Sequence, residues 1–151
     1  MPDADPFRFR LPVGVRFQDV DVYGHAHHSR ALIYFEEARW AYWGEVVGTQ
    51  SIEDVSYVMA EVQVRYHRRI LYPMTVEVCV RVSHLADKHF IMAYEARSPQ
   101  GDVLVSGSSV QVMYDYAEQT STTIPPAIRA ALEAWDGPFP EVRYRPDVGE
   151  S

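Results

Sequence analysis

Apolar and polar residues alternate with a period of two along most of the chain between about residues 57 and 116. Such alternation is typical of half-buried β-strands, because successive side chains of a strand point to opposite faces. We expect four long strands joined by short turns and forming an antiparallel meander. Their ranges are 57–70, 74–85, 88–98 and 102–116. An earlier segment, 13–17, alternates as well, with Val13, Val15 and Phe17 on one face.

The period changes to that of a helix between Ser29 and Gly48. Large apolar residues recur there at near-helical spacing, namely Leu32, Phe35, Trp40, Trp43 and Val47. Because few polar residues lie between them, the pattern predicts a mostly buried helix about 18–20 residues long that ends at Gly48. A shorter amphipathic helix is predicted after Pro125, with Leu132 and Trp135 on its apolar face.

These elements predict an α+β fold in which an antiparallel β-sheet wraps around one long central α-helix. We expect residues 12–136 to form a single domain, with a loose leader (1–11) before it and a tail (137–151) after it. The composition agrees with a globular chain, since 47% of the 151 residues are hydrophobic and 23% are charged. A disordered or fibrous chain is excluded on this ground.

The cysteine content and the charge limit the kinds of cross-link and binding partner that we expect. The single cysteine, Cys79, excludes an internal disulfide, and its place in an alternating run predicts a buried thiol. We expect a cytoplasmic protein that is not bound to a membrane, because no signal-peptide pattern and no apolar run of about 20 residues occurs. The net charge of −7 disfavours nucleic acid as a partner.

Two clusters of polar residues are candidates for chemistry. The first contains Arg65, His67, Arg68 and Arg69, which could bind a small anionic ligand or could be the solvated end of a strand.

The second cluster contains His25, His27 and His28, directly before the predicted helix. We expect no metal there, because adjacent histidines such as His27 and His28 rarely converge on one ion and the H-x-x-x-H spacing is missing. The chain also lacks the G-x-S-x-G motif of serine hydrolases.

The segment VRFQDVDVYGHAHHSRALIYFEEAR (15–39) carries two consecutive motifs. Residues 19–24 read D-x-D-x-x-G, and residues 31–39 follow the helix pattern Y-L-x-[FY]-[FL]-E-x-A-R except at its first position. The segment resembles the hotdog-fold acyl-CoA thioesterases, specifically the 4-hydroxybenzoyl-CoA thioesterase family, and a weaker likeness extends over residues 12–135. The chain departs from the family pattern at Arg30-Ala31, where many relatives have Asn-Tyr, and in the turn 69–75, which lacks a glycine.

The resemblance implies that the protein hydrolyses an acyl-CoA thioester to a free acid and CoA. Asp21 matches the second aspartate of the motif and would act as nucleophile or general base. The backbone N–H of His28, seven residues later, would hold the oxyanion at the N-terminus of the helix. Alternatively, Asp19 and Asp21 only cap the loop and the helix.

The same resemblance implies a set of substrate contacts. We expect Tyr23, Gly24 and His25 to contact the substrate. Arg65, Arg68 and Arg69 are candidates to hold the phosphates of CoA. CoA is part of the substrate, and no other cofactor is implied.

The family further implies a homodimer or homotetramer, in which two sheets join edge to edge and the active sites lie at the interface. Two other functions stay open, a thioesterase for carrier-protein thioesters and a non-catalytic acyl-CoA-binding protein. If Asp21 is not catalytic, Glu36 or Glu37 in the helix is the next candidate, although mid-helix glutamates more often form ion pairs.

Overall fold

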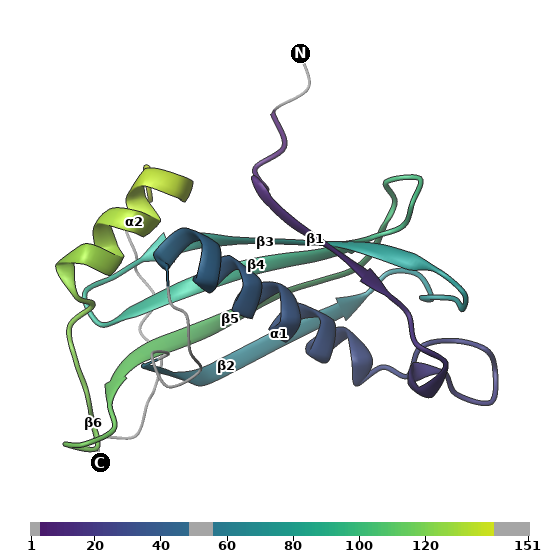
Figure 1. The fold of residues 1–151 in the computed structure, drawn as a ribbon, viewed down its shortest axis with the longest axis horizontal. Coiled ribbons are helices and arrows are strands. Elements are labelled where there is room, and N and C mark those ends of the chain that lie inside the picture. Colours follow the sequence, from purple (N-terminus) through teal and green to yellow (C-terminus); the bar gives the residue numbers. More distant parts are fainter. Residues whose placement is uncertain (1–3, 49–55, 141–151) are drawn as a thin grey trace. The chain divides into compact units, whose positions relative to one another are not determined.

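The computed structural model describes residues 4–48 and 56–140. Five strands of an antiparallel sheet lie in the order β1-β3-β4-β5-β2, and the short β6 pairs with β5 (Figure 1). The strands are β1 (Phe9–Gly14), β2 (Tyr57–Tyr66), β3 (Thr75–Leu85), β4 (His89–Arg97), β5 (Val103–Asp115) and β6 (Thr120–Ser121). The α-helices are α1 (Arg30–Tyr42) and α2 (Pro126–Asp136).

The chain divides into two compact units. The first comprises Met1–Tyr42, Val64–Arg81 and Tyr94–Gly107, and the second comprises Trp43–Gln63, Val82–Ala93 and Ser108–Ser151. All the candidate site residues of the sequence analysis belong to the first unit.

The predicted strands β3, β4 and β5 are confirmed, and they follow one another in the sheet. The predicted four-strand meander is wrong for β2, which lies beside β5 at an edge of the sheet and not beside β3. Alternation identifies a strand but not its neighbour, and residues 67–74 carry the chain from one side of the sheet to the other. As an edge strand, β2 leaves Val62 and Tyr66 about half exposed.

Strand β1 forms the other edge, and it begins at Phe9 inside the stretch expected to be a leader. It pairs antiparallel with β3, so that Phe9 lies opposite Val80 and Pro12 lies opposite Glu77. The strand starts early because Phe7 and Phe9 are both buried. The expected inward face at 13–17 is wrong for one residue, since Phe17 lies in a 3₁₀ turn (Phe17–Asp19) and is 80% exposed.

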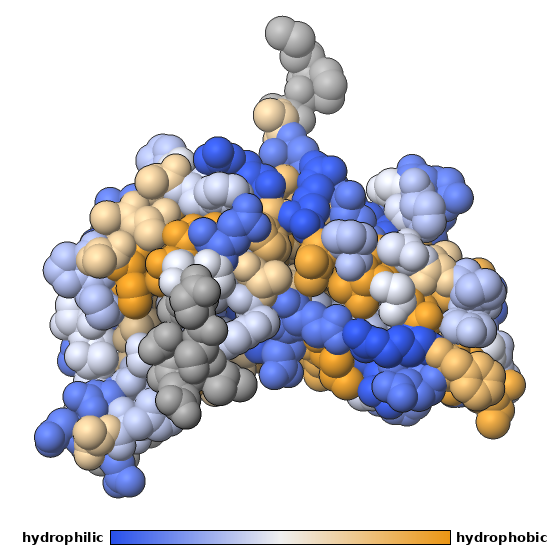
Figure 2. Space-filling view, viewed as in Figure 1, coloured by the Kyte–Doolittle hydropathy of each residue, from blue (hydrophilic) through white to orange (hydrophobic). Residues whose placement is uncertain are grey.

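The loop that follows β1 carries an exposed apolar surface, visible in Figure 2 at the end of the molecule where Figure 1 draws this loop. Val22 and Tyr23 are 93% and 79% exposed, and the ring of Phe17 makes an edge contact with Tyr72.

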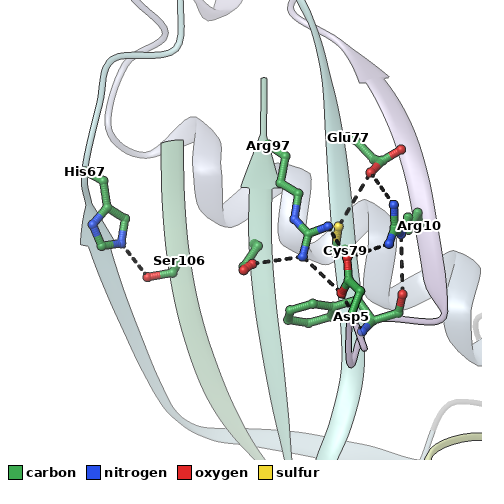
Figure 3. Close-up of polar contacts among 9 residues, drawn as sticks. Asp5, Arg10, His67, Glu77, Cys79, Arg97 and Ser106 are labelled. Carbon is green, nitrogen blue, oxygen red and sulfur yellow. Dashed lines mark hydrogen bonds and ion pairs between the residues drawn. The ribbon is translucent and has the colours of Figure 1, made fainter. Parts of the chain in front are cut away.

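Within the first unit, a network of charges around Asp5 holds the N-terminal segment against the strands (Figure 3). The Asp5 carboxylate accepts hydrogen bonds from Arg97 at 2.5 Å and from Arg10 at 2.6 Å. Arg97 also pairs with Glu95, and its guanidinium lies over the ring of Phe7. Cys79 is buried near this network, as its position in an alternating run predicted.

The predicted helix divides into two parts, because the 13-residue α1 is followed by a π-helical turn (Trp43–Val47). The buried face of α1 repeats at helical spacing and consists of Ala31, Tyr34, Phe35, Ala38 and Tyr42. Phe35 stacks on Tyr94, and Tyr42 makes an edge contact with Phe9 of β1. The expected burial of Leu32 and Trp40 is wrong, since these residues lie off that face and are 39% and 41% exposed.

In the second unit, Trp43 of the π-helical turn stacks on Phe90 and makes an edge contact with Tyr57. Helix α2 packs against this turn and buries Leu132, which confirms the predicted terminal helix. Asp136 anchors its last turn by accepting the Val82 N–H at 2.9 Å. Among the described residues, no helix is long and apolar enough to cross a membrane.

Candidate active site

The loop after β1 folds around the carboxylate of Asp21. Its Oδ1 accepts the backbone N–H of Tyr23 at 2.9 Å and that of His25 at 3.3 Å, which is the geometry of an Asx turn. The Asp21 backbone N–H donates to the carbonyl of His25, and Gly24 donates to the carbonyl of Asp21. Gly24 has a φ of +79°, which explains why the motif ends in glycine. The loop therefore holds one oxygen of Asp21, whereas Oδ2 has no partner among the described residues.

Asp19, two residues earlier, is an anchor of the same loop. Its side chain is fully buried and accepts the Tyr34 hydroxyl at 2.7 Å and the Arg16 N–H at 3.0 Å. Arg30 lies 3.5 Å from its other oxygen. Burial alone would raise the pKa of Asp19, but these partners hold it below its usual range. Burial and the bond to this carboxylate raise the pKa of Tyr34, so the hydroxyl stays protonated and donates.

A β-turn joins this loop to α1. The Arg30 N–H donates to the His27 carbonyl at 2.8 Å, which makes His28 and Ser29 the two central residues of the turn. The His27 N–H donates to the carbonyl of Asp19 at 2.8 Å, so the buried aspartate holds the turn as well. Within the described part of the chain, the His28 N–H has no hydrogen-bond partner.

A pocket of about 350 Å³ opens between this turn, the end of β2 and the segment that follows it. Its lining consists of Asp21, His25, Ala26, His27, His28, Ala31, Tyr66, His67, Arg68, Arg69, Ile70 and Val105. The wall of the pocket thus contains one aspartate, two arginines and four histidines. An anionic ligand would be attracted to this wall, and a water molecule or an ester carbonyl could reach Oδ2 of Asp21.

The pocket lies in a part of the chain that matches a known protein family. A family model described as the thioesterase-like superfamily matches residues 15–132, which include every residue that lines the pocket. The chain belongs to the thioesterase-like superfamily. The resemblance to hotdog-fold thioesterases in residues 15–39 is therefore confirmed, while the narrower assignment to the 4-hydroxybenzoyl-CoA branch stays a prediction.

Individual proteins of known sequence or structure are similar to this chain. A thioesterase from Thermus thermophilus, solved in complex with coenzyme A and Zn, is 29% identical with a TM-score of 0.80, over 89% of this chain and 98% of that one. A predicted thioesterase from Bacillus stearothermophilus shares the fold with a TM-score of 0.79 at 21% identity, over 88% and 98% of the two chains. The Bacillus subtilis (strain 168) protein YsmA, which is uncharacterised, is 26% identical over 106 residues, which are 70% of this chain and 72% of YsmA.

Within this thioesterase-family chain, seven of the residues singled out in the sequence line the pocket, namely Asp21, His25, His27, His28, His67, Arg68 and Arg69. Arg69 and His25 contact each other, with Nη1 of the arginine 3.1 Å from Nε2 of the histidine. Tyr23, Gly24 and Arg65 do not belong to the lining.

Sequence reasoning placed His67 in the basic cluster but did not name Tyr66, although both line the pocket. His67 contacts Ser106 of β5 at 2.8 Å (Figure 3), and Tyr66 donates its hydroxyl to the carbonyl of His28 at 2.5 Å. In the sequence Tyr66 stands between Arg65 and His67 of the basic cluster, but this position does not indicate its bond to His28.

The other candidates from the sequence lie outside the pocket lining. Glu37 pairs with Arg16 at 2.7 Å, which agrees with the ion-pair interpretation of the mid-helix glutamates, and Glu36 is not among the lining residues. Among the described residues, no three His, Cys, Asp or Glu side chains are grouped so that they could hold a metal ion.

Proposed function

We propose that this chain is an acyl-CoA thioesterase of the hotdog fold, in which the sheet wraps around α1. The observation that carries the proposal is that Asp21, His28, Arg68 and Arg69 line one pocket. Oδ2 of Asp21 and the N–H of His28 have no hydrogen-bond partner among the described residues. A carboxylate, an oxyanion donor and cationic side chains are the groups that hydrolysis of a phosphate-bearing thioester requires.

In this proposal Oδ2 of Asp21 is the reactive oxygen, because the loop already holds Oδ1. As a general base, it takes a proton from water while the water oxygen bonds to the thioester carbonyl carbon. The C–S bond then breaks, and the proton goes to the CoA thiolate. As a nucleophile, Oδ2 itself bonds to the carbonyl carbon and expels the thiolate, and water then hydrolyses the mixed anhydride.

The negative charge that develops on the carbonyl oxygen is held by the N–H of His28. This N–H lies in the turn that starts α1, where unpaired N–H groups and the helix dipole both favour an anion. Donors of this kind are effective because they are oriented before the reaction starts.

Arg68, Arg69 and His67 are proposed to bind the phosphates of CoA. The relative from Thermus thermophilus is itself a complex with coenzyme A, which supports CoA as the carrier of the acyl group. We further propose that the protein acts in the cytoplasm as a homodimer or homotetramer, with CoA as part of the substrate and no separate cofactor.

The test is release of free thiol from short, long and aromatic acyl-CoA esters by the wild type and by Asp21→Asn. An asparagine keeps the oxygen that the loop N–H groups need, so the loop is retained while the base or nucleophile is lost. We expect turnover to fall by about 10²–10⁴-fold.

A matched control is Asp115→Asn, since Oδ1 of Asp115 accepts the N–H groups of Ala117 and Glu118 in the same way but lies outside the pocket lining. Full turnover in Asp21→Asn would contradict the proposed site. No turnover of any CoA ester by the wild type would favour a carrier-protein thioester or a binding function.

A further inference from the structure

The hydroxyl of Tyr66 reaches across from β2 to the turn that starts α1. It donates a hydrogen bond of 2.5 Å to the carbonyl of His28, the residue whose own N–H has no partner within the described part of the chain. Tyr66 and His28 both line the pocket.

This carbonyl needs a partner from outside the helix. Helix α1 begins at Arg30, so its first intrahelical bonds are made to Ser29 and later carbonyls, and no helical N–H reaches the carbonyl of His28. Among the described residues, the Tyr66 hydroxyl is the donor that satisfies the His28 carbonyl, and both residues line the pocket.

The bond also fixes the orientation of a peptide that could otherwise rotate. The peptide between His28 and Ser29 is the middle peptide of the turn closed by Arg30 and His27, and such a peptide can rotate by about 180°, the difference between turn types I and II. In the present orientation its N–H lies 3.3 Å from Nδ1 of His27 and its carbonyl meets Tyr66.

Tyr66 is held firmly enough to act in this way. The two residues after it, His67 and Arg68, both donate their N–H groups to the carbonyl of Leu104, at 2.9 and 3.0 Å, and so tie the end of β2 to β5. Partial burial raises the pKa of Tyr66, which keeps its hydroxyl protonated as a donor.

We propose that Tyr66 is a positioning residue for the thioesterase reaction. It holds the peptide between His28 and Ser29 so that the His28 carbonyl stays bonded to Tyr66 and does not turn toward the developing oxyanion, which the His28 N–H of the preceding peptide would hold. The inference rests on the proposed function, because it assigns Tyr66 a role toward that oxyanion. Tyr66 itself need not touch the reacting atoms.

The test compares Tyr66→Phe, which removes only the hydroxyl, with Tyr116→Phe. The hydroxyl of Tyr116 also donates to a backbone carbonyl, that of Tyr57 at 3.0 Å, but Tyr116 does not belong to the pocket lining. For Tyr66→Phe we expect kcat to fall about tenfold with KM changed less than about twofold, and no change in either constant for Tyr116→Phe. The assays are run well below the unfolding midpoint of each variant.

A binding measurement separates positioning from a purely structural role. The carbonyl of a trifluoromethyl ketone analogue of the acyl-CoA adds a nucleophile, either Oδ2 of Asp21 or a water that gives up its proton to Asp21, and so becomes a tetrahedral oxyanion, whereas a thioether analogue has no carbonyl at that position. Tyr66→Phe is expected to bind the ketone about tenfold more weakly and the thioether as the wild type does. Equal affinity for the ketone in the variant and the wild type, or an unchanged kcat, would overturn the inference.

Asp21→Asn distinguishes this failure from failure of the proposed function. If Asp21→Asn abolishes turnover while Tyr66→Phe leaves kcat unchanged, only the positioning role is lost. If Asp21→Asn retains full turnover, the site itself is wrong.

Discussion

The hydroxyl of Tyr34 donates a 2.7 Å hydrogen bond to Oδ2 of Asp19, and neither side chain is in contact with solvent. Asp19 in turn holds Arg16 and His27 through its carboxylate and its carbonyl. The buried pair of Tyr34 and Asp19 thus supports the loop that carries Asp21, a residue of the pocket lining.

Removal of this buried hydroxyl is expected to destabilise the protein. Tyr34→Phe leaves a buried carboxylate with one donor fewer, which costs about 2 kcal/mol in the free energy of unfolding. Urea denaturation measures the change. In Tyr116→Phe, which removes an exposed hydroxyl, the change should stay within about 0.5 kcal/mol. Equal stability of the two variants would show that Asp19 is satisfied without Tyr34.

The ion pairs of Asp5 predict an acid-sensitive contribution to stability. The hydrogen bond from Arg97 lowers the pKa of Asp5 from 3.8 to about 2. Because the folded state binds this proton less readily than the unfolded state, the contribution is complete above pH 3.8 and is lost as the pH falls toward about 2. Thermal unfolding of the wild type and of Asp5→Asn from pH 5 to pH 2 should give midpoints that converge at the acidic end. A constant difference across this range would contradict the assignment.

The thiol of Cys79 is expected to be unreactive in the folded protein. The side chain is fully buried, and burial raises its pKa to about 11, so that only about one thiol in a thousand is ionised at pH 8. A thiol-reactive disulfide reagent should label the protein at least about 100-fold more slowly in buffer than in urea. Rapid labelling without denaturant would mean that the segment around Asp5 and Phe7 opens readily.

Arg69 and Arg65 provide a comparison within one basic cluster. Arg69 lines the pocket, whereas Arg65 does not. If Arg69 binds a phosphate of CoA, Arg69→Ala should raise KM about tenfold with a smaller effect on kcat, and added salt should raise the wild-type KM more than that of the variant. Arg65→Ala is expected to change KM less than about twofold. A larger effect of Arg65→Ala would place the phosphates along β2 instead.

Local patterns in the sequence were sufficient to predict much of this fold. The alternation in residues 74–85 predicted β3, and the structure buries Val76, Val78, Val80 and Val82 as expected. The place of β2 at an edge was not predictable in the same way, because pairing depends on contacts between distant segments. The exposure of Trp40 was missed for a related reason, since near-helical spacing does not decide which of several apolar stripes faces the core.

The candidate site was predictable where one short motif holds it together. The D-x-D-x-x-G motif identified Asp21, and the structure adds that the Tyr23 N–H closes an Asx turn on its side chain while Gly24, with its positive φ, donates to its carbonyl. Tyr66 was not identified, because its link to His28 joins two elements that are far apart in the sequence. A hydrogen bond between a side chain and a backbone carbonyl also leaves no trace in residue type, since any carbonyl could accept it.

The two edge strands, β1 and β2, differ in how readily a further strand could pair with them. Pro12 of β1 lies opposite Glu77 of β3 and has no backbone N–H. A proline is tolerated in an edge strand where its nitrogen faces away from the neighbouring strand. An incoming strand at this side would therefore lack a donor at Pro12. The edge at β2, residues 57–66, contains no proline. Addition of a further strand, whether by a second copy of the chain or by an aggregating one, is therefore hindered by Pro12 at the β1 edge, and no proline within residues 57–66 hinders it at the β2 edge.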